Sequence, residues 1–386
     1  MGTIHVEIAS SQSPKREGAV CGDVIAFERT PQATTIVVGD GVGSGIKAHL
    51  AATMAVSRLL ELLRAGFSLR QSCARLVETN EQAKASKEGD PYVAFTAIRI
   101  LNDGEATILG YEMPPPLLVG ARHASILPRR MIPMGKQMLG ESNCFVEPGD
   151  GILIFSDGVT TAGLGLSLRN GWGIDGANSF VNRILAEGTP LGDVPKKVIA
   201  QSRTLWERVG GDDCTATLAS CRLGETVNLF TGPPLNARED RTLVDRFLEL
   251  PGKKVVCGAT TAKIVASRLG KELTMKHVDP RKSAGIAPPG YSIEGIDLVT
   301  EGAVTLNQVY NIVDEDPSRF EHDEVAELCL LLQGADRINI FLGTAANPGH
   351  GHISFSQRGI LPRTKIVPLL REKLTEQGKL VVVETH

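Results

Sequence analysis

The stretch TIVVGDGVGSG, at residues 35–45, contains a β-branched apolar run that stops at Asp40 and the glycine after it. An apolar run of this kind predicts a buried strand, and an Asp-Gly pair predicts the turn that ends it. The stretch GILIFSDGVTT, at residues 151–161, repeats the pattern, and its apolar run stops at Asp157. Either pair alone is typical of an ordinary turn, but two near-identical endings in one chain indicate a shared role.

A third acidic stretch, GGDDCTATLA at residues 210–219, places Asp212 and Asp213 directly before an alternating apolar run. Three strand ends can bring carboxylates to one edge of a sheet core, where like charges repel strongly. A divalent cation removes that repulsion, and carboxylate oxygens are ligands that suit Mg²⁺ and Mn²⁺. The three stretches together indicate a metal-dependent hydrolase, whereas an acidic pair alone would indicate a solvated cap.

The order of these motifs resembles that of the PPM-type (type 2C) serine/threonine protein phosphatases. The closer resemblance is to the bacterial branch of stage II sporulation protein E and the sigma-B regulator phosphatases. Further segments match that branch in order: CGDVIAFE at 21–28, LGYEMPPPLLVG at 109–120, PMG at 133–135 and EPGD at 147–150. The resemblance covers about residues 3–222 and implies a four-layer αββα sandwich.

The resemblance also implies a role for each acidic residue. It implies two bound ions, Mn²⁺ or Mg²⁺, that activate a water for in-line attack on phosphorus. Asp40 would bridge the two ions, the Gly41 carbonyl would bind the second, Asp157 and Asp212 would complete the first, and Asp23 would act through a metal-bound water. Asp213 is the alternative ligand if the match within the acidic pair is shifted by one residue. The candidate catalytic residues are therefore Asp23, Asp40, Asp157 and Asp212.

The substrate that the resemblance implies is a phosphoserine or phosphothreonine protein, and in this branch an anti-sigma-factor antagonist. Eukaryotic relatives bind the substrate phosphate with an Arg upstream of the first Asp, which this branch generally lacks. Lys15 and Arg16 lie nearby in the sequence, but such a basic pair is typical of a solvated surface. Two other interpretations stay open: an inert phosphatase fold that serves as a scaffold or sensor, and a chain whose second half acts while the first half regulates it.

Hydrophobic periodicity divides the first part of the chain into helices and strands. Apolar residues at helical spacing, among them Ile46, Leu50 and Met54, predict an amphipathic helix over 46–64 that Gly66 ends. The other expected elements are a second helix from 68 to about 89, strands at 92–100, 105–110, 116–120, 124–127 and 215–221, and helices at 174–187 and 193–209.

The pattern changes after residue 224, where strands and helices begin to alternate. Such alternation favours a mostly parallel sheet covered by helices. Strands are expected at 227–230, 253–257, 337–342 and 380–384, and helices at 238–250, 261–269, 323–332 and 364–377. We therefore expect a phosphatase domain over 1–222 and an α/β domain over 225–386.

The second domain is expected to regulate the first by binding a small ligand or a partner. Its sequence contains no acidic or nucleophilic cluster, and two of its expected strands end in small, Gly-containing turns, at 253–261 and 337–347. Ligands of open α/β sheets lie beyond the carboxyl ends of the strands, where helix N-termini present free N–H groups. Thr260 and Thr261 could hold an anion there, or simply cap the following helix.

Composition narrows the classes of function. The 386 residues are 42% hydrophobic and 22% charged, as in ordinary globular proteins, and this length favours two domains. A net charge of −3 and an aromatic content of 4% argue against a nucleic-acid-binding surface. No apolar stretch approaches membrane-spanning length, and seven scattered cysteines are typical of a reducing compartment. We expect a cytoplasmic protein without nucleic-acid or membrane partners.

Overall fold

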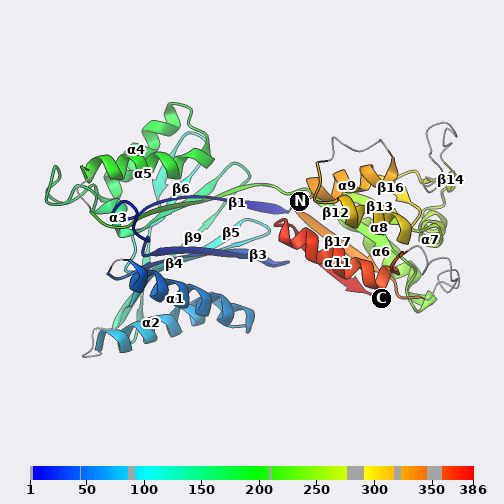
Figure 1. The fold of residues 1–386 in the computed structure, drawn as a ribbon, viewed down its shortest axis with the longest axis horizontal. Helices are drawn as coiled ribbons and strands as arrows, with labels where there is room; N and C mark the ends of the chain where they lie inside the picture. Colours follow the sequence, from blue (N-terminus) through cyan, green and yellow to red (C-terminus); the bar gives the residue numbers. More distant parts are fainter. Residues whose placement is uncertain are drawn as a thin grey trace. The chain divides into compact units, whose positions relative to one another are not determined.

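The structure is a computed structural model that describes residues 3–43, 45–85, 92–207, 211–275, 291–316, 323–345 and 359–386. The chain forms two compact units, Ile4–Leu223 and Gly224–His386, and Thr3 belongs with the second of them (Figure 1). In the described ranges, no helix combines the length and the apolarity that crossing a membrane requires.

Two antiparallel sheets form the centre of the first unit. Its strands are β1 Ile4–Ser13, β2 Asp23–Arg29, β3 Ala33–Gly41, β4 Val93–Leu101, β5 Glu105–Tyr111, β6 Leu117–Val119, β7 Ala124–Ile126, β8 Arg130–Met134, β9 Gln137–Phe145, β10 Gly151–Phe155 and β11 Cys214–Leu223. One sheet has the order β2-β3-β4-β5-β9-β8 and the other the order β1-β11-β10-β6-β7. Side chains such as Ile36, Ile98 and Ile154 form the core between the two sheets.

Helices cover the outer face of each sheet (Figure 1). Helices α1, Ile46–Arg64, and α2, Leu69–Ala85, pack on the sheet that contains β3 and β4. Helices α4, Gly173–Ala186, and α5, Val194–Leu205, pack on the sheet that contains β10 and β11. The four layers are helix, sheet, sheet and helix, which confirms the expected αββα sandwich.

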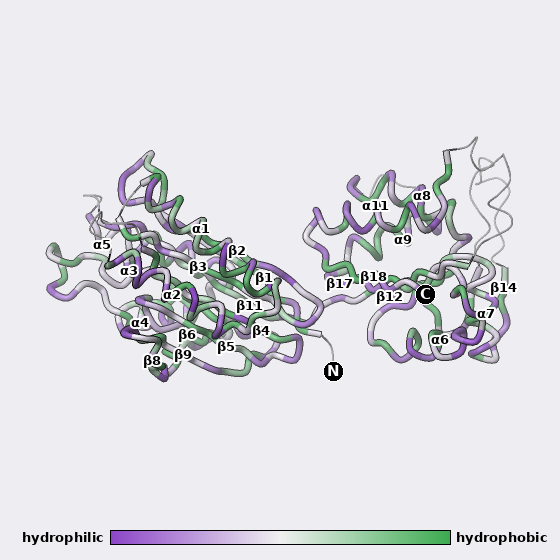
Figure 2. Tube along the Cα trace, turned by 90° about the horizontal axis from the view of Figure 1, so that it is seen from below, coloured by the Kyte–Doolittle hydropathy of each residue, from purple (hydrophilic) through white to green (hydrophobic). Residues whose placement is uncertain are grey.

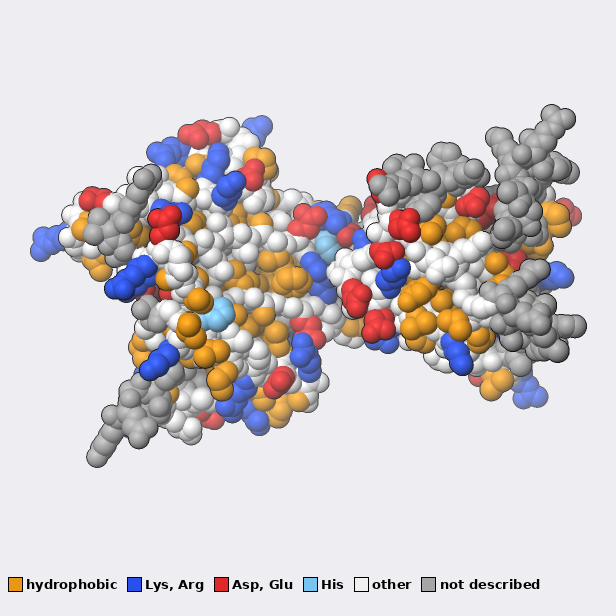
Figure 3. All heavy atoms as spheres, in the orientation of Figure 1, with side chains coloured by type: hydrophobic (Ala, Val, Ile, Leu, Met, Phe, Trp, Pro, Cys, Tyr) orange, Lys and Arg blue, Asp and Glu red, His pale blue; other side chains and the backbone are white. Residues whose placement is uncertain are grey.

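The periodicity of α1 predicted the helix but not the face that it buries. The side chains of Ile46, Leu50 and Met54 are 66%, 55% and 73% exposed, and Figure 3 shows hydrophobic side chains gathered over this helix. The buried side chains belong to an interleaved series of smaller residues, Ala48, Ala52 and Val56. A helix that carries small residues can approach the sheet closely, which matters for the turn that follows β3.

A mostly parallel sheet forms the centre of the second unit. Its strands are β12 Thr226–Thr231, β13 Lys253–Cys257, β14 Thr274–Met275, β15 Tyr291–Ser292, β16 Leu298–Thr300, β17 Arg337–Leu342 and β18 Leu380–Thr385. The order is β14-β15-β16-β13-β12-β17-β18, and the five strands from β16 to β18 in this order are parallel. This confirms the expected sheet, although the sequence did not predict β14, β15 or β16, which have only two or three residues each.

Helices cover both faces of this sheet, and hydrophobic residues gather along its strands, as the green stretch at β17 shows (Figure 2). Two helices pack on one face, α6 Asp240–Glu249 and α7 Ala259–Leu269. Three pack on the other, α8 Ala303–Ile312, α9 Glu324–Gly334 and α11 Arg363–Glu376. The chain builds β12, β13 and β16 outward in one direction, and then returns to place β17 on the other side of β12. The two halves of the sheet therefore diverge between β12 and β17, which is where open α/β sheets bind ligands.

Candidate active site

The acidic residues lie at the ends of strands that belong to the two sheets of the first unit. Asp23 begins β2 and stands directly opposite Asp40, near the end of β3, in the antiparallel ladder. Asp157 begins the short helix α3, Asp157–Thr160, just after β10. Asp212 comes just before β11, the strand that pairs with β10. Residues that are far apart in the sequence are thus brought to one end of the sandwich.

Asp40 experiences the charges of the other carboxylates. Burial, followed by the charges of Asp23 and Asp157, a hydrogen bond with Asp157 and the charge of Asp212, raises the pKa of Asp40 to about 9. At neutral pH without a cation, the Asp40 carboxyl therefore holds its proton. The main cause is burial, and repulsion from the other carboxylates, which a divalent cation would relieve, adds to it.

Asp23 is the most buried of these carboxyls, with only 2% of its surface exposed. Its Oδ2 atom accepts a hydrogen bond from Thr215 Oγ1 at 2.6 Å, and its buried Oδ1 atom has no hydrogen-bond partner among the described residues. Burial raises the pKa of Asp23 to about 7, and the Thr215 hydroxyl opposes that rise. Because Thr215 belongs to β11, this contact joins the ends of the two sheets.

Asp212 and Asp213 are adjacent in the sequence but have different surroundings. Asp213 is 4% exposed, and its two oxygens accept backbone N–H bonds from Lys15 at 2.7 Å and from Gly22 at 2.9 Å. Asp212 is only partly buried; its Oδ1 atom lies 3.9 Å from Lys15 Nζ, and burial, with the charge of Asp157 adding to it, raises its pKa. Asp213 therefore holds the loop between β1 and β2, while Asp212 faces the other carboxylates.

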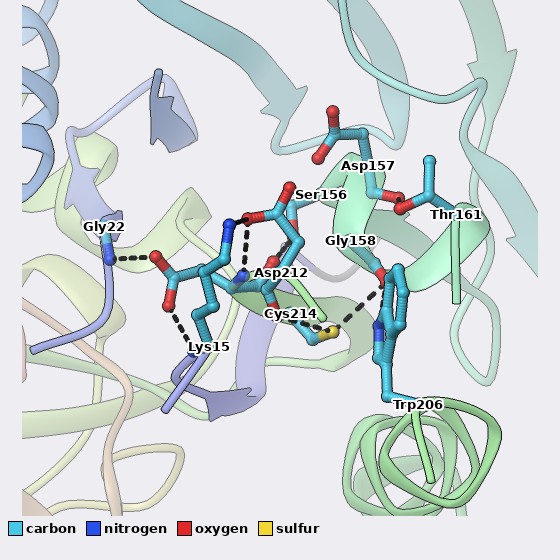
Figure 4. A network of polar contacts seen from close by, with 10 residues as sticks. Lys15, Gly22, Ser156, Asp157, Gly158, Thr161, Trp206, Asp212 and Cys214 are labelled. Carbon is cyan, nitrogen blue, oxygen red and sulfur yellow. Dashed lines mark hydrogen bonds and ion pairs between the residues drawn. The ribbon is translucent and has the colours of Figure 1, made fainter. Parts of the chain in front are cut away.

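The two Asp-Gly pairs need their glycines because the backbone approaches closely there. A Cβ atom on Gly41 would lie 2.1 Å from the Ala48 carbonyl oxygen of α1. A Cβ atom on Gly158 would lie 2.1 Å from the Asp213 carbonyl oxygen. The Gly158 carbonyl also accepts hydrogen bonds from Trp206 Nε1 at 3.1 Å and from Cys214 Sγ at 3.2 Å (Figure 4). These contacts fix the turns that carry Asp40 and Asp157.

The sequence-based reasoning missed the hydroxyl residues that position the carboxylates. Ser156 Oγ accepts the Thr215 N–H at 2.8 Å and lies 3.4 Å from the Asp213 carbonyl oxygen. Both residues lie inside the motifs quoted above, one immediately before Asp157 and the other two residues after Asp213. Their position in the sequence was visible, but their role depends on contacts between neighbouring strands.

The donor set fits a hard divalent cation. It consists of carboxylate oxygens, with one buried oxygen of Asp23 that has no partner in the described part of the chain and a carboxyl, Asp40, that burial and repulsion keep protonated. Across the same residues, no three His, Cys, Asp or Glu side chains form a ready-made metal cage. A cation would therefore have to displace the Asp40 proton and draw the carboxylates together.

The solved structures that resemble this chain are remote. They include the RsbU and RsbW domains of a Mycobacterium tuberculosis protein, with 20% identity and a TM-score of 0.45, covering 64% of this chain and 69% of that one. The phosphatase domain with a regulatory fragment of stage II sporulation protein E from Bacillus subtilis has 15% identity and a TM-score of 0.47, covering 57% of this chain and 65% of that one. The SiaA phosphatase domain of Pseudomonas aeruginosa has 14% identity and a TM-score of 0.43, covering 55% and 85%.

No curated protein sequence matches the chain. The family model of stage II sporulation protein E matches residues 30–222, which is half of the chain. The matched segment begins just before β3 and ends within β11, so it takes in the turns of Asp40, Asp157 and Asp212. The chain therefore belongs to the stage II sporulation protein E family of PPM-type phosphatases.

Proposed function

We propose that this protein is a metal-dependent phosphatase that removes phosphate from phosphoserine or phosphothreonine in a protein. The observation that carries the proposal is the meeting of Asp23, Asp40, Asp157 and Asp212 at one end of the sandwich, where burial and the neighbouring carboxylates raise the pKa of Asp40. Membership of a phosphatase family supports the reaction class. We assign the activity to residues 1–222.

In this proposal the acidic end of the sandwich holds two ions, Mn²⁺ or Mg²⁺. Asp40 would contact both ions, Asp157 and Asp212 the first, and the Gly41 carbonyl the second, while Asp23 would act through a bound water. Such ions supply positive charge for the phosphoryl oxygens and activate a water as nucleophile. Asp213 instead keeps the loop between β1 and β2 in place, since both of its oxygens accept backbone N–H bonds.

A catalytically inert scaffold is the main alternative. The crowding of carboxylates argues against it, because like charges at a buried position destabilise the fold unless a cation is bound. A scaffold would gain nothing from burying Asp40 among other carboxylates, which raises the pKa of Asp40. Turnover is therefore the property that separates the two functions.

The test is hydrolysis of phosphoserine and phosphothreonine peptides by the full chain. We expect turnover with added Mn²⁺ or Mg²⁺, none in excess chelator, and recovery when the metal is restored. Binding of the peptide without turnover in any metal would instead support the scaffold. Full activity in excess chelator would exclude the metal mechanism.

The physiological substrate belongs to the same proposal. In this branch of the family we expect a small phosphoserine regulator, such as an anti-sigma-factor antagonist, in the cytoplasm of a bacterium. Its support is the family alone. A comparison of kcat/KM for such a phosphorylated regulator and for an unrelated phosphopeptide tests it, and equal values would count against it.

For the second unit, residues 225–386, we propose a regulatory role through a small anionic ligand. The supporting observation is Arg363, at the start of α11 beside the carboxyl ends of β12 and β17. Its Nη2 atom donates to the Ala345 carbonyl at 2.9 Å, and it forms no ion pair among the described residues. Burial lowers the pKa of Arg363. Thr261 is not available in the way that the sequence suggested, because its buried hydroxyl accepts the Gly232 N–H at 2.9 Å.

A further inference from the structure

A second feature of the first unit lies apart from the carboxylates. A cavity of about 320 Å³ opens between the end of β5 and the hairpin of β8 and β9. Its walls include three methionines and two basic residues: Met113, Met131, Met138, Arg129 and Lys136. We call it the Arg129 cavity. Its volume is at the small end of the range for ligand pockets, which suits one side chain of a partner rather than a whole cofactor.

The Arg129 side chain is held in a fixed place. Gly110 of β5 and Gly140 of β9 are direct partners in the antiparallel ladder, so that side of the sheet is flat at this point. A Cβ atom on Gly140 would lie 2.9 Å from Arg129 Cδ, and one on Gly110 would lie 3.6 Å from Nη1. Arg129 Nη1 donates to the Met113 carbonyl at 2.7 Å. The guanidinium therefore lies across the two glycines with its orientation already set.

Among the described residues, no acidic side chain forms an ion pair with Arg129. Arg129 is partly buried, and burial lowers its pKa. The one carboxylate in the wall, Glu112, pairs with Lys84 at 2.6 Å. Lys136 adds a second cation to the wall. An occupant should therefore carry a negative charge on a short aliphatic stem, as Glu and Asp do.

The cavity lies on the same face of the sheet as the acidic residues. Asp40, Gly110 and Gly140 occupy positions in β3, β5 and β9 that face the other sheet, as Val38 and Ile108 do. Strands lie about 4.8 Å apart, so β5 is about 10 Å from β3, and a shift of two residues along the strand adds about 7 Å. The resulting distance of roughly 12 Å is spanned by three or four residues of extended peptide at about 3.3 Å each.

We propose that the Arg129 cavity binds an acidic side chain of the phosphoprotein substrate, three or four residues away from the phosphoserine. The inference rests on the proposed phosphatase function. The Arg129 guanidinium would bind the carboxylate, and the methionines would contact its stem. The cavity would thereby select substrates by sequence, without taking part in the hydrolysis.

The test compares phosphoserine peptides that differ at one position. Each peptide carries Glu or Gln at a single place two to five residues before or after the phosphoserine. In the wild-type protein we expect kcat/KM to be about tenfold higher for Glu at one position three or four residues away, since a charge-assisted hydrogen bond is formed there. Higher ionic strength should reduce the preference. Equal values for Glu and Gln at all positions would overturn the proposal without any variant.

Variants of the cavity residues test whether the acidic side chain binds in the Arg129 cavity. Arg129→Met should reduce the Glu-to-Gln ratio to about one, and Lys136→Met should reduce it by about threefold, as expected for a peripheral cation. Arg130→Met is the matched control, because Arg130 is the next residue, is exposed and does not line the cavity. A full preference retained in a folded Arg129→Met protein would refute the assignment. If Arg129→Met does not fold, an unchanged Glu-to-Gln ratio of kcat/KM in Lys136→Met would refute the assignment instead.

A binding measurement separates this inference from the proposed function. Fluorescence anisotropy of labelled peptides in chelator, where no turnover is expected, should show tighter binding of the Glu peptide to wild type than to Arg129→Met. If no peptide is hydrolysed in any metal but this difference is found, the phosphatase proposal fails and the cavity stands. If the peptides are hydrolysed without any preference for Glu in rate or in binding, the phosphatase proposal stands and the assignment of the cavity fails.

Discussion

The two units carry opposite chemistries at the ends of their strands. In the first unit, antiparallel strands from two sheets bring four carboxylates together, and burial together with their repulsion raises the pKa of Asp40. In the second unit, parallel strands end beside Arg363, a partly buried guanidinium without an ion-pair partner among the described residues. A cluster of like charges requires a cation, and an unpaired cation favours an anion. The comparison suggests catalysis in one unit and ligand binding in the other.

The largest effect should come from Asp40. Asp40→Asn should lower metal-dependent kcat/KM by about 10³-fold or more, because it removes the carboxylate proposed to contact both ions. Without metal, the variant should be as stable as wild type or more so, since folding at neutral pH requires wild-type Asp40 to take up a proton, whereas the amide is neutral in both states. Steady-state kinetics at saturating Mn²⁺ and urea unfolding in chelator measure the two properties.

The control for this variant is Asp175→Asn, which changes an exposed carboxylate on α4. It should leave both activity and stability nearly unchanged. Undiminished turnover in Asp40→Asn at saturating Mn²⁺ would show that the acidic end of the sandwich is not the active site. The comparison between the two units would then no longer hold.

Asp212 and Asp213 should separate activity from stability. Asp212→Asn should lower kcat/KM by about 10²-fold with little change in stability. Asp213→Asn should lower the free energy of unfolding by about 1–3 kcal/mol, because an amide NH₂ group would face a backbone N–H donor. Kinetics and urea unfolding of both variants settle the assignment. A stable Asp213→Asn with the greater loss of activity would show that the ligand is Asp213.

Stability and metal affinity should depend on pH in opposite directions. The folded pKa of Asp40, about 9, is above its ordinary value of 3.8, so folded Asp40 keeps a proton that the unfolded chain has lost. The associated stability is fully present below about 3.8 and is lost as the pH rises through 9. Metal binding displaces this proton. The metal affinity should therefore rise by up to about tenfold per pH unit at pH values below the folded pKa of Asp40, about 9.

Calorimetric titration with Mn²⁺ from pH 6 to pH 9, and urea unfolding in chelator over the same range, measure this dependence. In Asp40→Asn, the part of the pH dependence that comes from Asp40 should be absent from both the Mn²⁺ affinity and the free energy of unfolding. The same absence in the wild-type protein would mean that the carboxylates do not share a proton, and that the two units differ less than proposed.

The smallest effects should come from the second unit. Deleting residues 225–386 should leave a folded, metal-dependent phosphatase whose rate or substrate choice changes by a few-fold, as for typical allosteric coupling. In chelator, millimolar inorganic phosphate should raise the Tm of the full chain by about 2 °C if it occupies the proposed site. Arg363→Met should lose this shift, while Arg371→Met, which changes an exposed residue of the same helix, should keep it.

Identical kinetics of the truncated and full-length proteins on the physiological substrate, under all conditions tried, would end the regulatory proposal. An equal phosphate shift in Arg363→Met would place anion binding elsewhere. Either result would leave the proposal for the first unit unchanged. It would contradict the proposed contrast between catalysis in the first unit and ligand binding in the second.

The sequence predicted most helices and strands of both units because apolar runs and turns report local structure directly, and the family resemblance implied the four layers of the first unit. It did not predict which face of α1 is buried. Ile46, Leu50 and Met54 form one series of i, i+4 positions, and the buried series is offset from it by two residues. Periodicity gives the spacing of the apolar residues along the helix. Which series of them packs on the sheet depends on side-chain size. The short strand β16 was missed because three residues carry too little pattern to identify a strand, and the expected strands also omitted the nine-residue β9.

The sequence by itself determined which residues are acidic, that Asp40 and Asp157 follow buried strands, and that their order resembles a phosphatase family. Only the tertiary structure distinguished Asp212 from Asp213, since the backbone N–H groups of Lys15 and Gly22, nearly two hundred residues away, reach Asp213. It alone placed Arg129 across two paired glycines. The physical reason is that strand ends are set by local patterns, whereas hydrogen-bond partners and shared charge depend on segments that meet only when the chain folds.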